Sequence, residues 1–460
     1  MTDWKQEAVL PKPVAADGYC PQNGKEVTFL LGTDVHIGDP DTREQRVAIT
    51  PTQAGDLKRW LETLGLKAHI FVVKDAGARA GFPDDEYVAQ GARIIEEGDL
   101  ATMSPVPDVV HALKESTHYE ATIPGPFLRI GALHSGDFKP SCGLAQVLTE
   151  GAFCGVFDGS AVGGFAFDSE FEVRPKFRIP LRSSMSVYAG KLAGEDVGKQ
   201  LGAGGERVVV SGGGVVGTSA IDVLLEDHEH QLSEVLIIEK FASRCKELRD
   251  LYQNHPVVRV KQGFEVTEED IRDAAGLILT IFVQGSAITP KVVDLDRLRL
   301  MKSGGYVVDV AIDEGGGVAI SKDGQVDPHT GRPVMVTIED IRGEVETLPN
   351  RLTYHADNHM PRRRPREASI EHGNTCLMYL ATLLYLCAEQ GGPKNVIKAI
   401  MDQDNLFKPK TIRDALVLDL KNGMAFTKLN EIVVLYRHVL KKSDDIQTFL
   451  NDAGVLNTFA

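Results

Sequence analysis

A glycine-rich segment near the middle of the chain has residue types and a spacing that could bind phosphate. Gly212, Gly214 and Gly217 stand in the order G-x-G-x-x-G, between a β-branched run and a helical stretch. In such a turn the first glycine makes the tight bend, the second lets a pyrophosphate approach the backbone, and the third lets the helix pack on the strand. The helix N-terminus, with Val215 and Val216, then offers free N–H groups to the phosphates. The segment therefore predicts a dinucleotide site.

An acidic residue follows the glycine turn at the distance that this chemistry requires. Glu239 lies 22 residues beyond Gly217, at the end of the next predicted strand. A carboxylate there can accept from both ribose hydroxyls and would repel a 2′-phosphate, so Glu239 favours NAD. Lys240 and Arg244 are close enough in sequence to accept a 2′-phosphate, which keeps NADP as the alternative cofactor. A glycine turn alone can be only a tight strand-to-helix connection; the strand, the helix and the acid together favour binding.

Polar side chains follow several predicted strands, at the edge where open α/β sheets bind ligands. Lys114 and His134 each directly follow a strand, Arg46 lies in the loop after the first strand, and Asp313 follows a strand of the second half. Two cations, an imidazole and a carboxylate suit hydride transfer at a carbon that bears a carboxylate. Each also has a structural interpretation, as a solvated cation, a hydrogen-bonded histidine or a capping aspartate.

Short β-branched runs alternate with helical periods, which is typical of α/β units around parallel sheets. We expect a helix from Thr50, with Pro51 at its first position and Gln53 closing a capping box, and a second helix over roughly 185–202. The expected strands are 26–32, 68–73, 108–113 and 128–133 in the first unit and 207–211, 234–239, 257–260, 276–282 and 306–312 in the second.

The fold class expected is α/β, with two Rossmann-like doubly wound domains. After about residue 365 the chain becomes helical again, and we expect these helices to fold back on the first unit. The catalytic domain is then discontinuous and comprises 1–180 and 366–460. The NAD-binding Rossmann domain comprises 181–365.

Composition excludes several classes of protein. The 460 residues are 25% charged and 43% hydrophobic, which is average for a globular chain. The formal net charge of −15 argues against nucleic-acid or anionic-membrane partners, except at the arginine cluster (Arg362, Arg363, Arg364 and Arg366). No apolar run reaches the roughly 20 residues of a membrane span, and the first 20 residues do not resemble a signal peptide, so a cytoplasmic location is expected. The six cysteines show no paired spacing for zinc; we expect reduced thiols and no metal.

Several strings resemble the alanine dehydrogenase and nicotinamide nucleotide transhydrogenase family, with fungal saccharopine dehydrogenase as a more distant relative. They occur in the family's order between about residues 26 and 390. The matching strings are EQRVAITP (44–51), LK (113–114), LH (133–134), MSVYAGKLAG (185–194), GGGVVG (212–217), MKSGGYVVDVAIDEGG (301–316) and MP (360–361).

This resemblance implies roles for the strand-end residues. Arg46 and Lys114 would hold the substrate carboxylate and the oxo or imine group, and His134 would be the general acid/base. Asp313 would orient His134 or the attacking water. Met185 would line the pocket, although it also fits ordinary helix core.

The resemblance has consequences for the cofactor and for assembly as well. Lys240 and Met360 join the glycine turn and Glu239 as cofactor-binding residues. The family also implies a homo-oligomer.

Departures from the family pattern concern the substrate. Ala132 stands where alanine dehydrogenases have an aromatic residue two positions before the catalytic histidine, and His359 replaces an asparagine before Met-Pro. With the arginine cluster, these changes suggest a substrate larger than alanine, with a second carboxylate. A solvated face is the other interpretation of the cluster.

The leading hypothesis is an NAD-dependent amino-acid dehydrogenase that reversibly deaminates an L-amino acid to its 2-oxo acid. The alternative is an opine- or saccharopine-type enzyme that joins an amino acid and a 2-oxo acid by reductive condensation. A third hypothesis, of another class, is a non-catalytic dinucleotide sensor on the same fold. The amino acid, the physiological direction and the role of residues 1–25 stay open.

Overall fold

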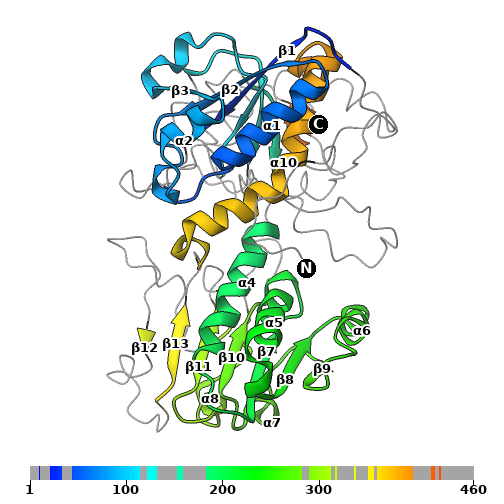
Figure 1. The fold of residues 1–460 in the computed structure, drawn as a ribbon. Coiled ribbons are helices and arrows are strands. Elements are labelled where there is room, and N and C mark those ends of the chain that lie inside the picture. The colour runs from blue at the N-terminus through cyan, green and yellow to red at the C-terminus, as the bar shows by residue number, and fades with distance from the viewer. Residues whose placement is uncertain are drawn as a thin grey trace, which may run out of the picture. The chain divides into compact units, whose positions relative to one another are not determined.

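The structure is a computed structural model, and the chain divides into two compact units. The first is formed by 1–184 together with 364–460, and the second by 185–363. The parts of the chain that the structure describes are residue 10 and residues 21–33, 44–113, 122–131, 153–158, 183–281, 290–311, 316–318, 336–337, 351–356, 360–396, 416–419 and 424–425. Each unit contains its own sheet (Figure 1).

The first unit is built on an eight-stranded sheet with the order β15-β14-β6-β5-β4-β1-β2-β3. Six strands run parallel in the Rossmann order 3-2-1-4-5-6, which reverses between β1 and β4. Strand β14 continues the sheet in the antiparallel sense and pairs with β15. The strands are β1 Glu26–Leu31, β2 Lys67–Val73, β3 Arg93–Ile95, β4 Val109–His111, β5 Phe127–Gly131, β6 Phe153–Asp158, β14 Leu416–Asp419 and β15 Met424–Ala425.

The second unit repeats this topology in a seven-stranded sheet with the order β12-β13-β11-β10-β7-β8-β9. In Figure 1 the strands lie side by side in this order. Its six parallel strands have the same 3-2-1-4-5-6 order, which reverses between β7 and β10. The strands are β7 Glu206–Ser211, β8 Leu232–Glu239, β9 Val258–Gln262, β10 Gly276–Leu279, β11 Tyr306–Asp309, β12 Val336–Thr337 and β13 Thr353–Ala356. The expected pair of Rossmann-like α/β sheets is confirmed.

Helix α1 begins where its capping residues predict, and the helix expected over roughly 185–202 is observed as α4 over Ser183–Gly198. Helix α1 starts at Pro51 and carries the expected capping box, since the Gln53 N–H donates to Thr50 Oγ1 and the Thr50 N–H donates to Gln53 Oε1. The helices are α1 Pro51–Thr63, α2 Asp84–Ala89, α4 Ser183–Gly198, α5 Val215–His228, α6 Ala242–Leu251, α7 Glu268–Ile271, α8 Leu295–Leu298 and α10 Pro365–Gln390, with short 3-10 turns at η2 Ala78–Ala80, η3 Glu97–Thr102, η7 Glu229–Gln231 and η9 Met360–Arg363. None of the described helices is long and apolar enough to cross a membrane.

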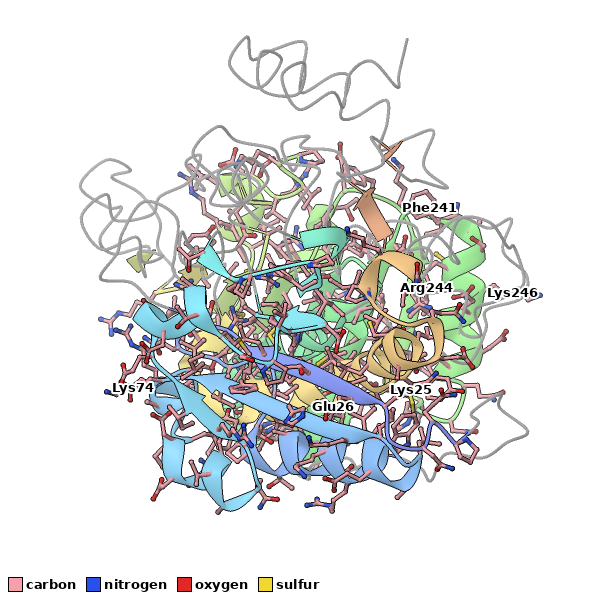
Figure 2. The ribbon with its side chains drawn as sticks, turned by 90° about the horizontal axis from the view of Figure 1, so that it is seen from above. Lys25, Glu26, Lys74, Phe241, Arg244 and Lys246 are labelled. Carbon is pink, nitrogen blue, oxygen red and sulfur yellow. The ribbon has the colours of Figure 1, made fainter. Side chains whose placement is uncertain are left out.

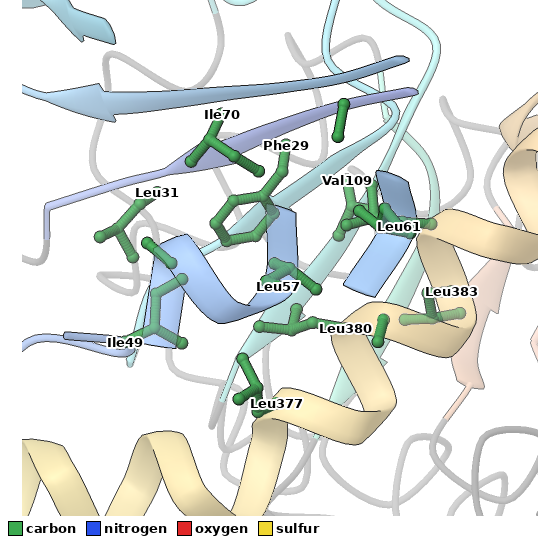
Figure 3. Close-up of a cluster of buried hydrophobic side chains, with 14 of the residues drawn as sticks. Phe29, Leu31, Ile49, Leu57, Leu61, Ile70, Val109, Leu377, Leu380 and Leu383 are labelled. Atoms are coloured by element: carbon green, nitrogen blue, oxygen red, sulfur yellow. The ribbon is translucent and has the colours of Figure 1, made fainter. Parts of the chain in front are cut away.

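The core of the first unit shows the chain returning to it after residue 364. Helices α1 and α10 lie side by side on the sheet, and Phe29 of β1 is enclosed by Leu57 of α1 and Leu380 of α10 (Figure 3). All three side chains are fully buried. Burial of each such side chain contributes about 1.5–3 kcal/mol. The expectation that the late helix folds back on the first unit is therefore confirmed.

Glycine residues on α4 allow this helix to pack closely against α5 in the second unit. A Cβ atom at Gly190 would collide with the carbonyl oxygen of Val216, and one at Gly194 would collide with that of Ala220. The two helices can approach this closely only because α4 presents glycine at both positions. Helix α5 is thereby fixed from one side at its first turn, directly after the glycine turn.

Several strands differ from the sequence prediction at their ends. The expected strands 108–113, 276–282 and 306–312 end at His111, Leu279 and Asp309 respectively, and residues 132–133 of the expected strand 128–133 lie outside the described residues. Each run contains apolar residues beyond the last ladder pair, and apolarity alone does not mark where pairing stops. Strands β3, β6, β12, β13, β14 and β15 were absent from the prediction.

Candidate active site

The glycine turn between β7 and α5 satisfies three separate steric demands. Gly212 has φ +104°, a conformation that side chains rarely adopt. A Cβ atom at Gly217 would collide with the Gly212 carbonyl oxygen, whereas one at Gly214 would meet no atom within 4 Å. Gly212 thus makes the bend, Gly217 allows helix and strand to touch, and Gly214 leaves its outer side open to an incoming group.

The first turn of α5 directs backbone donors toward this open side. Gly214 is the N-cap, and the first helical hydrogen bond runs from the Thr218 N–H to the Gly214 carbonyl at 2.9 Å. The N–H groups of Val215, Val216 and Gly217 precede that bond and have no partner within the helix. With the helix dipole they form an anion site of the kind that binds pyrophosphate.

Glu239, the last residue of β8, is tied to the same turn. Its side chain is buried, Oε2 accepts a hydrogen bond from the Gly213 N–H at 2.9 Å, and Oε1 accepts one from the Phe241 N–H at 2.9 Å. A carboxylate has about four lone-pair positions, so each oxygen keeps one for a ribose hydroxyl. The residues present therefore fit NAD, with the pyrophosphate at the turn and a ribose at Glu239.

The basic residues next to Glu239 have partners of their own. Arg244 donates from Nε to the Gly213 carbonyl at 2.8 Å and from Nη1 to Glu247 at 2.7 Å. Lys240 Nζ lies 5.7 Å from the centre of the Phe241 ring, in cation–π range. Phe241 is the N-cap of α6, and Arg244 lies in the first turn of this helix (Figure 2). Arg244 therefore braces the turn, and the negative Glu239 is a charge that would favour NAD; its contact with a ribose stays a prediction.

Two methionines of the predicted site are also in the second unit. Met185 is half-buried in the first turn of α4, and Met360 is fully buried at the start of η9. Asp313 lies outside the described residues. The contacts of Met185, Met360 and Asp313 with substrate or cofactor stay a prediction.

Arg46 is the one predicted substrate residue of the first unit that the structure describes. It is buried, and its guanidinium donates from Nε and Nη2 to the two carboxylate oxygens of Glu44, both at 2.8 Å. The next residue is anchored too, since the Val47 N–H donates to Ser369 Oγ on α10 at 2.9 Å. A guanidinium has five N–H donors, so the pair with Glu44 orients Arg46 and uses two of them.

Lys114, Ala132 and His134 lie outside the described residues, but the strands that lead to them are adjacent. Strands β4 and β5 pair in parallel, with His111 opposite Ile130. The chain leaves both strands at one edge of the sheet, next to the point where the strand order reverses between β1 and β4. This edge is where open α/β sheets bind ligands.

Sequence inspection missed a buried cation at the same edge. Arg129 of β5 is fully buried, and its Nη1 donates to the carbonyls of Ala112 and Ile130. The available signal was a single charge inside the apolar run LRIGAL. A buried charge requires hydrogen-bond partners, so an arginine within an apolar strand indicates that acceptor groups lie beside that strand.

The arginine cluster has members in both units, with different contacts. Arg363, in the second unit, forms a bidentate pair with Asp196 on α4. Burial alone would raise the pKa of Asp196, but hydrogen bonds from His355 and Arg363 outweigh it and lower the pKa to about 2. Arg366, in the first unit, lies over the Phe82 ring at 4.0 Å and donates to the Gly81 carbonyl. Both side chains thus have structural roles.

The fold and the glycine turn define a class of protein, the dinucleotide-binding proteins with two Rossmann-like domains. Comparison with known families agrees. Residues 40–141 match the family Alanine dehydrogenase/PNT, N-terminal domain, and residues 189–408 match Alanine dehydrogenase/PNT, C-terminal domain. The chain belongs to the alanine dehydrogenase/PNT family, and membership confirms NAD as the cofactor.

Individual relatives support this membership. Alanine dehydrogenase of Halomonas elongata is 31% identical over 297 residues, which cover 61% of this chain and 72% of the relative. Alanine dehydrogenase of Methanococcus maripaludis is 29% identical over 302 residues, covering 63% and 74%. Among solved structures, an L-alanine dehydrogenase superposes with a TM-score of 0.60 at 21% identity, covering 85% of this chain and 95% of that one. The transhydrogenase from Sinorhizobium meliloti gives 0.57 at 17% identity, covering 78% and 95%. These structures share the fold.

Proposed function

We propose that this protein is an NAD-dependent amino-acid dehydrogenase that reversibly deaminates an L-amino acid to its 2-oxo acid. The observation that carries the proposal is the glycine turn braced by Glu239, which fits NAD, in a chain whose relatives are alanine dehydrogenases. The relatives make L-alanine the first substrate to test. Ala132, in place of an aromatic residue, predicts that larger side chains are accepted as well.

The proposed chemistry assigns one task to each polar residue at the strand ends. A bound NAD would supply the acceptor for the α-hydride of the substrate. Arg46, oriented by Glu44, holds the carboxylate, and Lys114 holds the oxo or imine group. His134 is proposed to remove a proton from the water that attacks the imine carbon, and Asp313 to orient either His134 or that water. For this task the pKa of His134 should lie near the working pH.

The test is NADH appearance with a panel of L-amino acids, followed by the reverse reaction with 2-oxo acids and ammonia. Turnover with L-alanine, and with ammonia in reverse, supports the proposal, and the panel measures how far Ala132 widens the pocket. Turnover only when a second amino acid replaces ammonia would contradict it and support the condensing alternative. Silence with NAD still bound would support the sensor hypothesis. Arg363 pairs with Asp196, and Arg366 lies over the Phe82 ring. Because both guanidinium groups already have structural contacts, they do not indicate a substrate with a second carboxylate, and this favours the reaction with ammonia.

The role of His134 can be tested separately. The variant His134→Ala should lose turnover by at least about 100-fold, the usual contribution of a general acid/base. Its affinity for NAD should be unchanged, because the glycine turn belongs to the second unit. Loss of both turnover and NAD affinity would contradict this role. His69→Ala is the matched control, since His69 pairs with Glu26 on β1 and is outside the predicted site.

A further inference from the structure

Three side chains of two metal-binding types, histidine and cysteine, meet in the core of the first unit, and none of them is among the predicted substrate or cofactor residues. They are His111, the last residue of β4, and His372 and Cys376, which lie one turn apart on α10. All three are buried, and their ligand atoms lie within 4.8 Å of one another. We name this group the His–His–Cys cluster. From these positions we infer that it is a binding site for a transition-metal dication, with zinc as the best match.

His111 is set up as a ligand by its own hydrogen bond. Its Nδ1 lies 3.0 Å from the carbonyl oxygen of Ile130, which can only accept, so Nδ1 carries the proton. The lone pair of the neutral ring is then on Nε2. This atom is buried, and no described group hydrogen bonds to it. Metal-bound histidines characteristically donate their other ring N–H to a backbone carbonyl in this way.

The two ligands on α10 have the spacing that places them on one face. His372 and Cys376 are four residues apart, and side chains at this spacing are neighbours on a helix. The rings of His372 and His111 are nearly parallel, with an interplanar angle of 16° and centroids 5.8 Å apart.

The distances are close to those of a loaded site. Zinc bonds of about 2.0–2.1 Å to nitrogen and about 2.3 Å to sulfur place tetrahedral ligands roughly 3.4–3.6 Å apart. Closure from the present separations therefore requires side-chain shifts of about 1 Å.

The chemistry of the donors selects the class of metal. Two imidazoles and a thiolate suit zinc, cobalt or copper, whereas calcium and magnesium require oxygen ligands. Three protein ligands leave a fourth position for water or another group. Cys376 must lose its proton; burial raises the pKa of the thiol, and a coordinating metal ion overcomes this by its own charge.

Arg129 acts against the binding of a cation, because it donates to the same Ile130 carbonyl as His111. The thiolate offsets part of this repulsion, since zinc with one thiolate adds a single net positive charge.

The position of the cluster gives the metal a structural task. It would clamp the carboxyl end of β4 to α10, and Lys114 follows His111 by only three residues. This inference does not depend on the proposed dehydrogenase activity, since none of the three ligands belongs to the predicted substrate or cofactor site.

The test uses the full chain, stripped of metal with a chelator and then titrated with Co²⁺. We expect one cobalt per chain, with a thiolate-to-cobalt charge-transfer band in the near ultraviolet. The band should be absent in Cys376→Ser and weakened in His372→Asn. It should persist in Cys387→Ser, a matched control because Cys387 is also buried on α10. Absence of the band in the wild type, or its persistence in Cys376→Ser, overturns the inference.

A second measurement protects against a folding defect in the variants. Zinc added to the stripped wild-type protein should raise the midpoint of thermal unfolding by about 5 °C or more, since a ligand that binds only the folded state stabilises it. Cys387→Ser should show the same rise. The zinc concentration should be one that saturates metal sites of two imidazoles and one thiolate. An unchanged midpoint in the wild type at this concentration overturns the inference.

Discussion

The carboxylate of Glu239 accepts a hydrogen bond from the Gly213 N–H at 2.9 Å, so the acid at the end of β8 also fixes the shape of the glycine turn after β7. Glu239 is the last residue of β8, Gly213 lies in the turn that follows β7, and these two strands pair in parallel. One side chain therefore links the two parts of the predicted cofactor site, the ribose end and the pyrophosphate end.

Replacement of this acid should change which cofactor is used. In Glu239→Gln the negative charge is lost, so the repulsion of a 2′-phosphate disappears and the hydrogen bonds to the ribose weaken. A hydrogen bond to a charged group is worth about 1.5–3 kcal/mol, so kcat/KM for NAD should fall by about 10- to 100-fold. The ratio of kcat/KM for NADP to that for NAD should rise. Steady-state kinetics with both cofactors measure this.

The control for that variant is Glu247→Gln, since Glu247 pairs with Arg244 nearby at an exposed position. Its cofactor preference should match the wild type. Equal shifts in both variants would show that the general charge of the region, and not the Glu239 contact, determines the preference.

Alanine substitutions at two glycines of the turn should have different effects, one on the binding of NAD and the other on the stability of the fold. A methyl group at Gly214 would meet no atom within 4 Å, so Gly214→Ala should fold with an unchanged unfolding midpoint. The same methyl group occupies the open side of the turn, so the KM for NAD should rise by at least about 10-fold through steric exclusion of the pyrophosphate. A wild-type KM in Gly214→Ala would contradict the placement of the cofactor there.

Gly217→Ala is the complementary variant. Its methyl group would collide with the Gly212 carbonyl, so the helix and strand must separate. Overpacking of this kind costs about 1–3 kcal/mol of the free energy of unfolding. Thermal unfolding with and without NAD should show a lower midpoint in both conditions. An unchanged midpoint would show that α5 moves away from β7 at little cost.

How far the fold follows from sequence depends on how local its determinants are. The strands β1, β2, β7 and β8 are long apolar runs, and α1 carries its capping box within four residues, so all are predictable. Strand β13 is four residues long and includes a buried histidine, and it exists because β11 pairs with it. Short strands of this kind are formed by their neighbours, and a single-chain pattern does not indicate them.

The same distinction applies to the site. The spacing of the glycines and of Glu239 is local, and the turn was found from it. The pair between Asp196 and Arg363 joins residues 167 positions apart, so the sequence alone does not distinguish this pair from a contact between Arg363 and a substrate carboxylate. This contact forms only because the tertiary fold places α4 beside η9. The local sequence of neither element indicates that arrangement.

The Asp196–Arg363 pair should make the stability of the second unit depend on pH in the acid range. The folded-state pKa of Asp196 is lowered from 3.8 to about 2, so its contribution is fully present above about pH 4 and is lost as the pH falls toward about 2. A shift of this size corresponds to about 2 kcal/mol. Asp196→Asn should lower the free energy of unfolding by about this amount at pH 7 and remove that part of the acid dependence.

The measurement is urea unfolding at a series of pH values from 2 to 7, with Asp250→Asn as control because Asp250 is an exposed carboxylate on α6. The difference between wild type and Asp196→Asn should shrink below pH 4. A difference that stays constant down to pH 2 would show that Asp196 stabilises the unit through packing and not through its charge.

The core that joins α10 to the first unit should be tested by a deletion of side-chain volume. Leu380 is fully buried between α10 and the sheet, so Leu380→Ala should lower the free energy of unfolding by about 2–5 kcal/mol, through lost burial and the cavity left behind. Trp60 of α1 is buried in the same cluster, so its fluorescence, in a Trp4→Phe background, reports the unfolding of this unit. Val88→Ala, at a position 53% exposed, is the control and should change the free energy by no more than about 0.5 kcal/mol. Equal losses in both variants would contradict the assignment of α10 to this core.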